Sequence, residues 1–171
     1  MDLRNRRSFP ALAGVLLVGS LVAACSTSNS GTGSTTSNPD RSRGLCTLIT
    51  PAEVEAITGS AVGTPRSVLQ GDTTDCTYSA GNASHSVLIR YVIPANAASF
   101  AGDERSVASQ GKQVTAVPGL GDQAFAVSET VGGTTKNSVV ARKGTTMVLV
   151  SGTATGAQVN ELATLALDRA G

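Results

Sequence analysis

The sequence predicts an α+β fold in which a largely antiparallel sheet carries helices, in the order helix, three strands, helix, four strands, helix. Three observations lead to this prediction. Two capping-box sequences mark helix starts, and short β-prone segments alternate with glycine-containing turns. In addition, 40% of the 171 residues are hydrophobic, which is enough to fill one core. We place a single globular domain at residues 45–171.

The first helix is predicted to begin directly after Thr50. Thr50 and Glu53 form a Thr-x-x-Glu capping box, and Pro51 takes the first helical position, where its missing N–H is not needed. Gly59 then provides a stop signal. We therefore expect a short helix that ends before Gly59.

Short strands fill most of the middle of the chain. The first three are predicted at Arg66 to Gln70, Asp75 to Ser79 and Ser86 to Ile93. A weaker helix over Ala97 to Gln110 is followed by four more strands, at Gln113 to Val117, Ala124 to Thr130, Ser138 to Lys143 and Thr145 to Gly152. Residues 147–150 are apolar on both faces of the pleat, which predicts a place in the middle of the sheet.

The last helix follows a second capping box, formed by Thr155 and Gln158. Its apolar residues fall on one arc and its polar residues on the other, as expected of a helix that packs on a sheet. The apolar arc consists of Val159, Leu162, Ala163, Leu165, Ala166, Leu167 and Ala170.

The first 24 residues have the layout of a signal peptide. Three arginines precede a mostly apolar run from Phe9 to Ala24, which is shorter than a membrane-spanning helix usually needs. The segment Leu21-Val22-Ala23-Ala24-Cys25 resembles the lipobox of bacterial lipoproteins. This resemblance implies cleavage before Cys25, a thioether-linked diacylglycerol on its sulfur, often a further acyl chain, and attachment to the extracytoplasmic face of the cell membrane.

The export route is left open by the residues before the apolar run. The segment Asn5-Arg6-Arg7-Ser8-Phe9 resembles a twin-arginine export signal, whereas Pro10 stands where that signal usually has an apolar residue. General secretion and twin-arginine export are both compatible with this pattern.

Residues 25–44 are predicted to be a lipidated linker. From Ser26 to Gly44 the only apolar side chain is that of Pro39, and ten of the nineteen residues are Ser or Thr. Such a segment cannot bury enough apolar surface to offset the entropy of ordering. Its ends should lie about 24 Å apart on average, so it would hold the domain away from the lipid surface.

The chain has three cysteines, an odd number for an exported protein. If Cys25 carries lipid, Cys46 and Cys76 remain, and in an oxidising envelope we expect them to form a disulfide that joins the first helix to a strand. Such a bridge should contribute about 3–4 kcal/mol to the free energy of unfolding. A redox-active pair is the alternative, but no Cys-x-x-Cys spacing supports it.

Few residues point to catalysis. The balance of 13 Lys+Arg against 12 Asp+Glu gives no reason to expect nucleic-acid binding, and His85 is the only histidine. A serine hydrolase using His85 stays a remote alternative, because no Gly-x-Ser-x-Gly sequence is present. The segment Gly119-Leu120-Gly121-Asp122 reads as a turn rather than a phosphate-binding loop. We expect no catalytic residue, metal site or cofactor.

Three segments carry a family resemblance: Leu45 to Val54, Asp75 to Ser79, and Pro118 to Ala124. Together they resemble uncharacterised small lipoproteins of actinobacteria, including mycobacterial lipoproteins grouped as domains of unknown function. The resemblance implies an envelope location and a disulfide, but no reaction. We therefore expect a non-enzymatic module that binds an envelope protein or a small ligand. The alternatives are a carrier or sensor of an apolar molecule and an unrecognised hydrolase.

Overall fold

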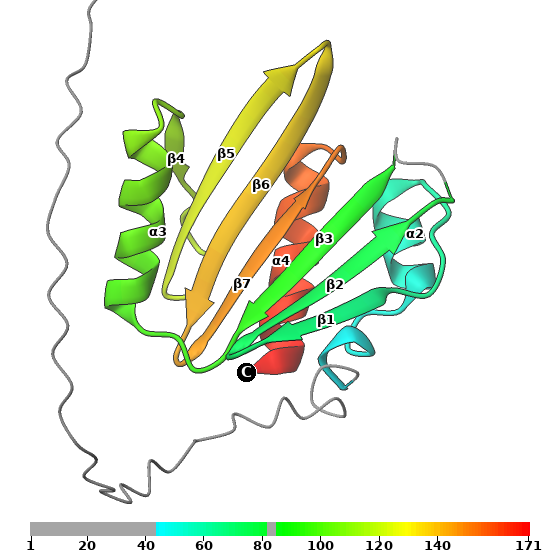
Figure 1. Cartoon of the computed structure of the whole chain (residues 1–171), viewed down its shortest axis with the longest axis horizontal. Helices are drawn as coiled ribbons and strands as arrows, with labels where there is room; N and C mark the ends of the chain where they lie inside the picture. The colour runs from blue at the N-terminus through cyan, green and yellow to red at the C-terminus, as the bar shows by residue number, and fades with distance from the viewer. Residues whose placement is uncertain (1–43, 82–84) are drawn as a thin grey trace, which may run out of the picture. The chain divides into compact units, whose positions relative to one another are not determined.

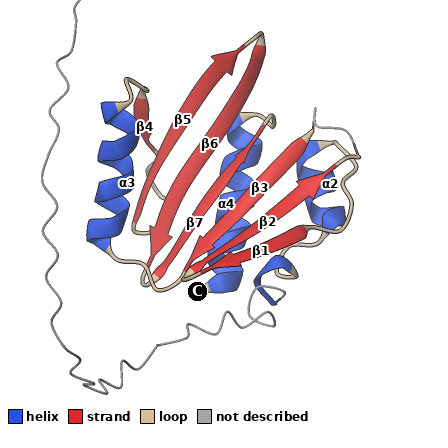
Figure 2. Cartoon of the chain, viewed as in Figure 1, coloured by secondary structure: helices blue, strands red, loops and turns tan. Residues whose placement is uncertain are grey.

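The computed structural model describes residues 44–81 and 85–171. The predicted signal peptide, Cys25, the arginine pair and nearly all of the linker lie outside these residues. A helical turn at 44–46 is followed by ten elements (Figures 1 and 2): α2 (Pro51–Thr58), β1 (Arg66–Gln70), β2 (Thr73–Ser79), β3 (Ser86–Val92), α3 (Ala97–Ser109), β4 (Val114–Ala116), β5 (Gln123–Val131), β6 (Thr134–Lys143), β7 (Thr146–Gly152) and α4 (Gly156–Ala170). The predicted α+β fold class and the order of its elements are confirmed.

The sheet has seven strands in the order β1-β2-β3-β7-β6-β5-β4, and every neighbouring pair is antiparallel. It therefore consists of two groups of sequential strands that meet where β3 pairs with β7 (Figure 1). The prediction that 147–150 lie in mid-sheet is confirmed, because β7 is the central strand. Strands β1 and β4 form the two edges.

Both capping boxes predicted from the sequence are present. Thr50 caps α2 together with Glu53, and Thr155 caps α4 together with Gln158. Gly59 ends α2 with a positive φ of 71°, a conformation that glycine adopts without a Cβ penalty. Asn96 caps α3 through two backbone N–H groups, a signal that the sequence prediction did not use.

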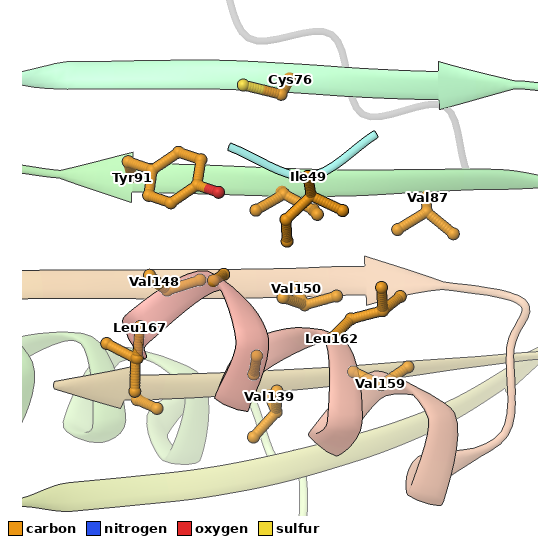
Figure 3. Close-up of a cluster of buried hydrophobic side chains, with 14 of the residues drawn as sticks. Ile49, Cys76, Val87, Tyr91, Val139, Val148, Val150, Val159, Leu162 and Leu167 are labelled. Atoms are coloured by element: carbon orange, nitrogen blue, oxygen red, sulfur yellow. The ribbon is translucent and has the colours of Figure 1, made fainter. Parts of the chain in front are cut away.

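One face of the sheet forms the main core. Side chains that alternate along β2, β3, β7 and β6 point toward α4, whose predicted apolar arc packs on them (Figure 3). Val54 of α2 and Ile49, which precedes α2, complete this core. The largest fully buried side chains are in this cluster or, in the case of Phe125, in the cluster on the opposite face.

The opposite face is covered over part of its width by α3. Phe100 of α3 packs edge-to-face on Phe125 of β5, with ring centroids 5.4 Å apart, and Met147 lies in the same cluster. Over β2 and β3 this face carries an ion pair instead, in which Arg90 donates to both carboxylate oxygens of Asp75 at 2.7 and 2.8 Å. Helices α2 and α4 thus cover one face of the sheet, and α3 covers part of the other.

Two strand boundaries differ from the prediction by more than a residue. β6 begins at Thr134 rather than Ser138, because β5 and β6 continue as a polar hairpin beyond the core. Its first residues are exposed on both faces, so the burial alternation that predicts a strand is missing there. β2 begins two residues early, at Thr73, because it pairs with the last residue of β1.

Candidate functional site

The predicted disulfide is present between Cys46 and Cys76. The two Cα atoms are 5.3 Å apart, and 30 positions separate the residues in the sequence. Cys46 lies in the helical turn at 44–46, and Cys76 lies in β2, with both side chains buried. The bridge therefore joins the segment before α2 to the sheet, as the sequence indicated. Cys25 lies outside the described residues.

The hydroxyl of Tyr78 on β2 also contacts the segment before α2. Tyr78 is buried beneath residues 46–49 and donates to the backbone carbonyls of Cys46 and Ile49, at 3.3 and 2.7 Å. Burial raises the pKa of this phenol from 10.0 to about 12. The segment is thus tied to β2 both by a covalent bond and by a neutral hydroxyl.

A third tie comes from the C-terminal end of α4. Arg169 forms a two-pronged ion pair with Glu53 and also donates to the carbonyl of Leu48. Glu53 accepts hydrogen bonds from the backbone N–H and the hydroxyl of Thr50, at 2.8 and 2.9 Å. The hydrogen bonds from Arg169 and then Thr50 lower the pKa of Glu53 from 4.5 to about 2. Residues 46–53 therefore form a wall that is fixed at several points.

A groove of about 610 Å³ lies between this wall and the start of β1. Among the described residues that line it, none is charged and none is aromatic: Cys46, Thr47, Ile49, Thr50, Pro51, Thr64, Pro65 and Ser67. The volume is within the range of small-molecule sites. We take this groove as the candidate functional site and call it the β1 groove.

Sequence reasoning missed the β1 groove. Its two sides come from the segments before and after α2, and their small, uncharged side chains carry no local signature of binding. One further feature is visible only in the structure: the buried hydroxyl of Ser67 has no hydrogen-bond partner among the described residues. An unsatisfied buried hydroxyl is uncommon and costs stability.

A smaller pocket of about 170 Å³ lies beside His85. Hydroxyl groups of Thr58, Ser60, Ser86 and Thr155 surround it, but its described lining contains neither a carboxylate nor a cysteine. The nucleophile–histidine–carboxylate arrangement that activates a serine is therefore not assembled by these residues.

The glycine-containing segment at 119–122 forms a turn, as predicted. Gly119 and Gly121 both have positive φ values, and Leu120 between them is buried. The backbone N–H of Asp122 donates to the carbonyl of Arg142 at 2.7 Å, while its carboxylate accepts from the N–H of Gly144 at 2.9 Å. The segment thus fastens the start of β5 to the end of β6.

Within 44–81 and 85–171, no group of three or more His, Cys, Asp or Glu side chains is arranged to hold a metal ion. No helix in this part of the chain combines the length and hydropathy needed to cross a bilayer. Comparisons of the sequence and the structure with protein-family models, curated proteins and solved structures found no match.

Proposed function

We propose that this chain is a lipoprotein, held on the extracytoplasmic face of the cell membrane by lipid chains on Cys25, whose folded domain is a non-enzymatic binding module. The observation that carries the proposal is the Cys46–Cys76 disulfide. It uses two of the three cysteines and leaves Cys25, at the end of the lipobox-like segment, without a disulfide partner in the chain. Structural disulfides belong to oxidising compartments, which supports export.

The binding role is supported by a contrast between two cavities. The β1 groove is larger than the His85 pocket, has an uncharged and mostly apolar lining, and is bounded by a wall that three sets of contacts fix. Preformed apolar cavities of this size bind small ligands or side chains of a partner protein. The His85 pocket offers hydroxyls but no activating carboxylate in its described lining. The geometry therefore favours binding over chemistry, with an envelope protein or a small ligand as the partner.

Replacing Cys25 tests the attachment directly. In cells that export the protein, we expect the full chain to sediment with membranes, whereas Cys25→Ser should appear in the soluble fraction. The Cys46→Ala/Cys76→Ala double variant is the matched control, since it removes the same kind of residue but should remain with the membrane. If Cys25→Ser sediments with membranes as completely as the wild type, the proposal is wrong.

A second candidate function, a carrier or sensor of an apolar molecule, is favoured by the position of the β1 groove. The groove lies between the N-terminal end of α2 and the edge of the sheet, and its described lining is uncharged. Co-purification tests this role: the released Cys25→Ser chain should carry a lipid in native mass spectrometry. A chain recovered without any bound molecule argues for a protein partner instead.

A further inference from the structure

The lining of the β1 groove restricts the chemistry of its ligand. Ile49, Pro51, Pro65 and the disulfide present aliphatic and sulfur surface, and the described lining has no side chain that would neutralise a charged group. It also has no aromatic ring on which a planar ligand would stack. These features fit an uncharged aliphatic ligand better than a nucleotide, a sugar acid or an aromatic compound.

The groove is preformed rather than assembled on binding. One wall is held by the disulfide, by the Tyr78 hydroxyl and by Arg169. The other consists of Thr64 and Pro65, which lead into β1, and of Ser67, which lies on β1 and is therefore held by the sheet. A rigid apolar cavity loses little entropy when a ligand enters, so burial of methylene groups is expressed as affinity. A chain of methylenes would gain about fourfold in affinity for each one buried.

The β1 groove lies close in the sequence to the end of the predicted linker, and therefore close to the proposed lipid anchor. Cys46 lines the groove only two residues after Gly44, where the predicted linker ends. If Cys25 is anchored, the average distance between the anchor and the start of the domain is about 24 Å, so the groove stays close to the bilayer. Bilayer lipids are then the most concentrated aliphatic compounds near the groove.

We propose that the β1 groove binds one acyl chain of a membrane lipid, with the lipid head group outside the groove. This inference rests on the proposed binding function and names its ligand class. The source is a lipid of the bilayer, not the acyl chains attached to Cys25. The other occupant to be tested is an extended polypeptide. Within residues 44–81 and 85–171, β1 is an edge strand whose one partner is β2, so its free edge can accept a further strand.

The probe is cis-parinaric acid, a fluorescent fatty acid, and the protein is the full chain carrying Cys25→Ser. Straight-chain 1-alkanols of increasing length then compete with the bound probe, and the loss of fluorescence gives their affinities. We expect saturable binding with one site, and alkanol affinities that rise about fourfold per methylene until the groove is full. Absence of saturable binding, or affinities independent of chain length, would overturn the proposal.

A bulky side chain at the rim tests the location. Thr64 is exposed and lines the groove, so Thr64→Trp should weaken binding of the probe by at least about tenfold without altering the core. The matched control is Thr134→Trp, at a threonine of β6 that is also exposed and does not line the groove. Equal probe affinity in the two variants would place the binding elsewhere and contradict the assignment.

Two further outcomes show whether the acyl chain comes from the bilayer or from Cys25, and whether the groove binds a lipid or a polypeptide. The lipidated wild-type chain should bind the probe as tightly as Cys25→Ser; if only Cys25→Ser binds it, the attached acyl chains fill the groove and the assignment to a bilayer lipid is wrong. A polypeptide bound in native mass spectra, in place of a lipid, would identify strand addition instead. The proposed function fails separately, if Cys25→Ser is not released from membranes.

Discussion

Removing the Cys46–Cys76 disulfide should cost a large part of the stability of the domain. In the loop-entropy model, a separation of 30 residues corresponds to about 12 cal/mol/K of lost denatured-state entropy, or about 3.6 kcal/mol at 298 K. Substitution of both cysteines by alanine is the suitable perturbation. Both side chains are buried, and alanine introduces no polar group at either position.

The assay is equilibrium unfolding in urea, followed by far-ultraviolet circular dichroism because the chain has no tryptophan. Wild type and the double variant are compared in the Cys25→Ser background, and the wild type is also measured after reduction. We expect the double variant and the reduced wild type to lose similar free energies of unfolding, about 3–4 kcal/mol. A loss below about 1 kcal/mol would refute the reasoning, since the remaining contacts of the wall would then suffice.

Three further substitutions, one of them with a control variant, test other parts of the structure. Tyr78→Phe should reduce the free energy of unfolding by about 1–3 kcal/mol, because it removes the hydroxyl that donates to the Ile49 carbonyl at 2.7 Å and lies 3.3 Å from the Cys46 carbonyl. Because burial raises the pKa of Tyr78 to about 12, its contribution to the free energy of unfolding should be full below pH 10.0 and fall as the pH rises toward 12. Unfolding of the wild type and of Tyr78→Phe across this pH range measures the difference. Hydrogen bonds from Arg169 and then from Thr50 lower the pKa of Glu53 to about 2. Its contribution to the free energy of unfolding should therefore be full above pH 4.5 and decline as the pH falls toward 2. Glu53→Gln should remove this dependence from acid-unfolding curves. Gly121→Ala should cost about 1–3 kcal/mol in thermal unfolding, because its φ is 62° and a Cβ would lie 2.5 Å from a carbonyl oxygen of β6; Gly119→Ala, with open space around its Cβ, should cost less.

Local chemistry in the sequence predicted the helices and most strands. The capping boxes at Thr50 and Thr155 are contained within four residues each, and the structure confirms both. Burial alternates along β2 and β3, as expected of strands with one face on the core; the buried residues are Thr74, Cys76 and Tyr78 of β2 and Val87, Ile89 and Tyr91 of β3. The apolar run at 147–150 likewise predicted a central strand, which β7 is, and Met147 and Val148, on opposite faces, are both buried.

Long-range relationships were not predictable in the same way. The pairing of β3 with β7 joins segments separated by α3 and three strands, and no local pattern selects that partner. The polar start of β6 lacks a buried face, so its pairing with β5 left no alternation to detect. The β1 groove depends on how Thr64 and Pro65 approach the segment before α2, which only the folded chain determines.

The disulfide is a long-range contact that the sequence nevertheless predicted. The cysteine count predicted the Cys46–Cys76 pair once Cys25 was assigned to lipid, and the structure confirms the pair. The assignment of Cys25 itself stays a prediction, as do the export route, the signal peptide at 1–24, the actinobacterial lipoprotein family and the non-enzymatic role. These depend on residues outside the described part of the chain or on partners.

The intact mass of the protein extracted from membranes tests the central claim most directly. A chain that begins at the residue after Ala24 and is heavier by a diacylglycerol, with or without a further acyl group, is the predicted result. The other two sulfurs should resist a thiol reagent until a reductant is added. A chain that still begins at Met1, or one whose Cys25 carries a free thiol, would contradict the account.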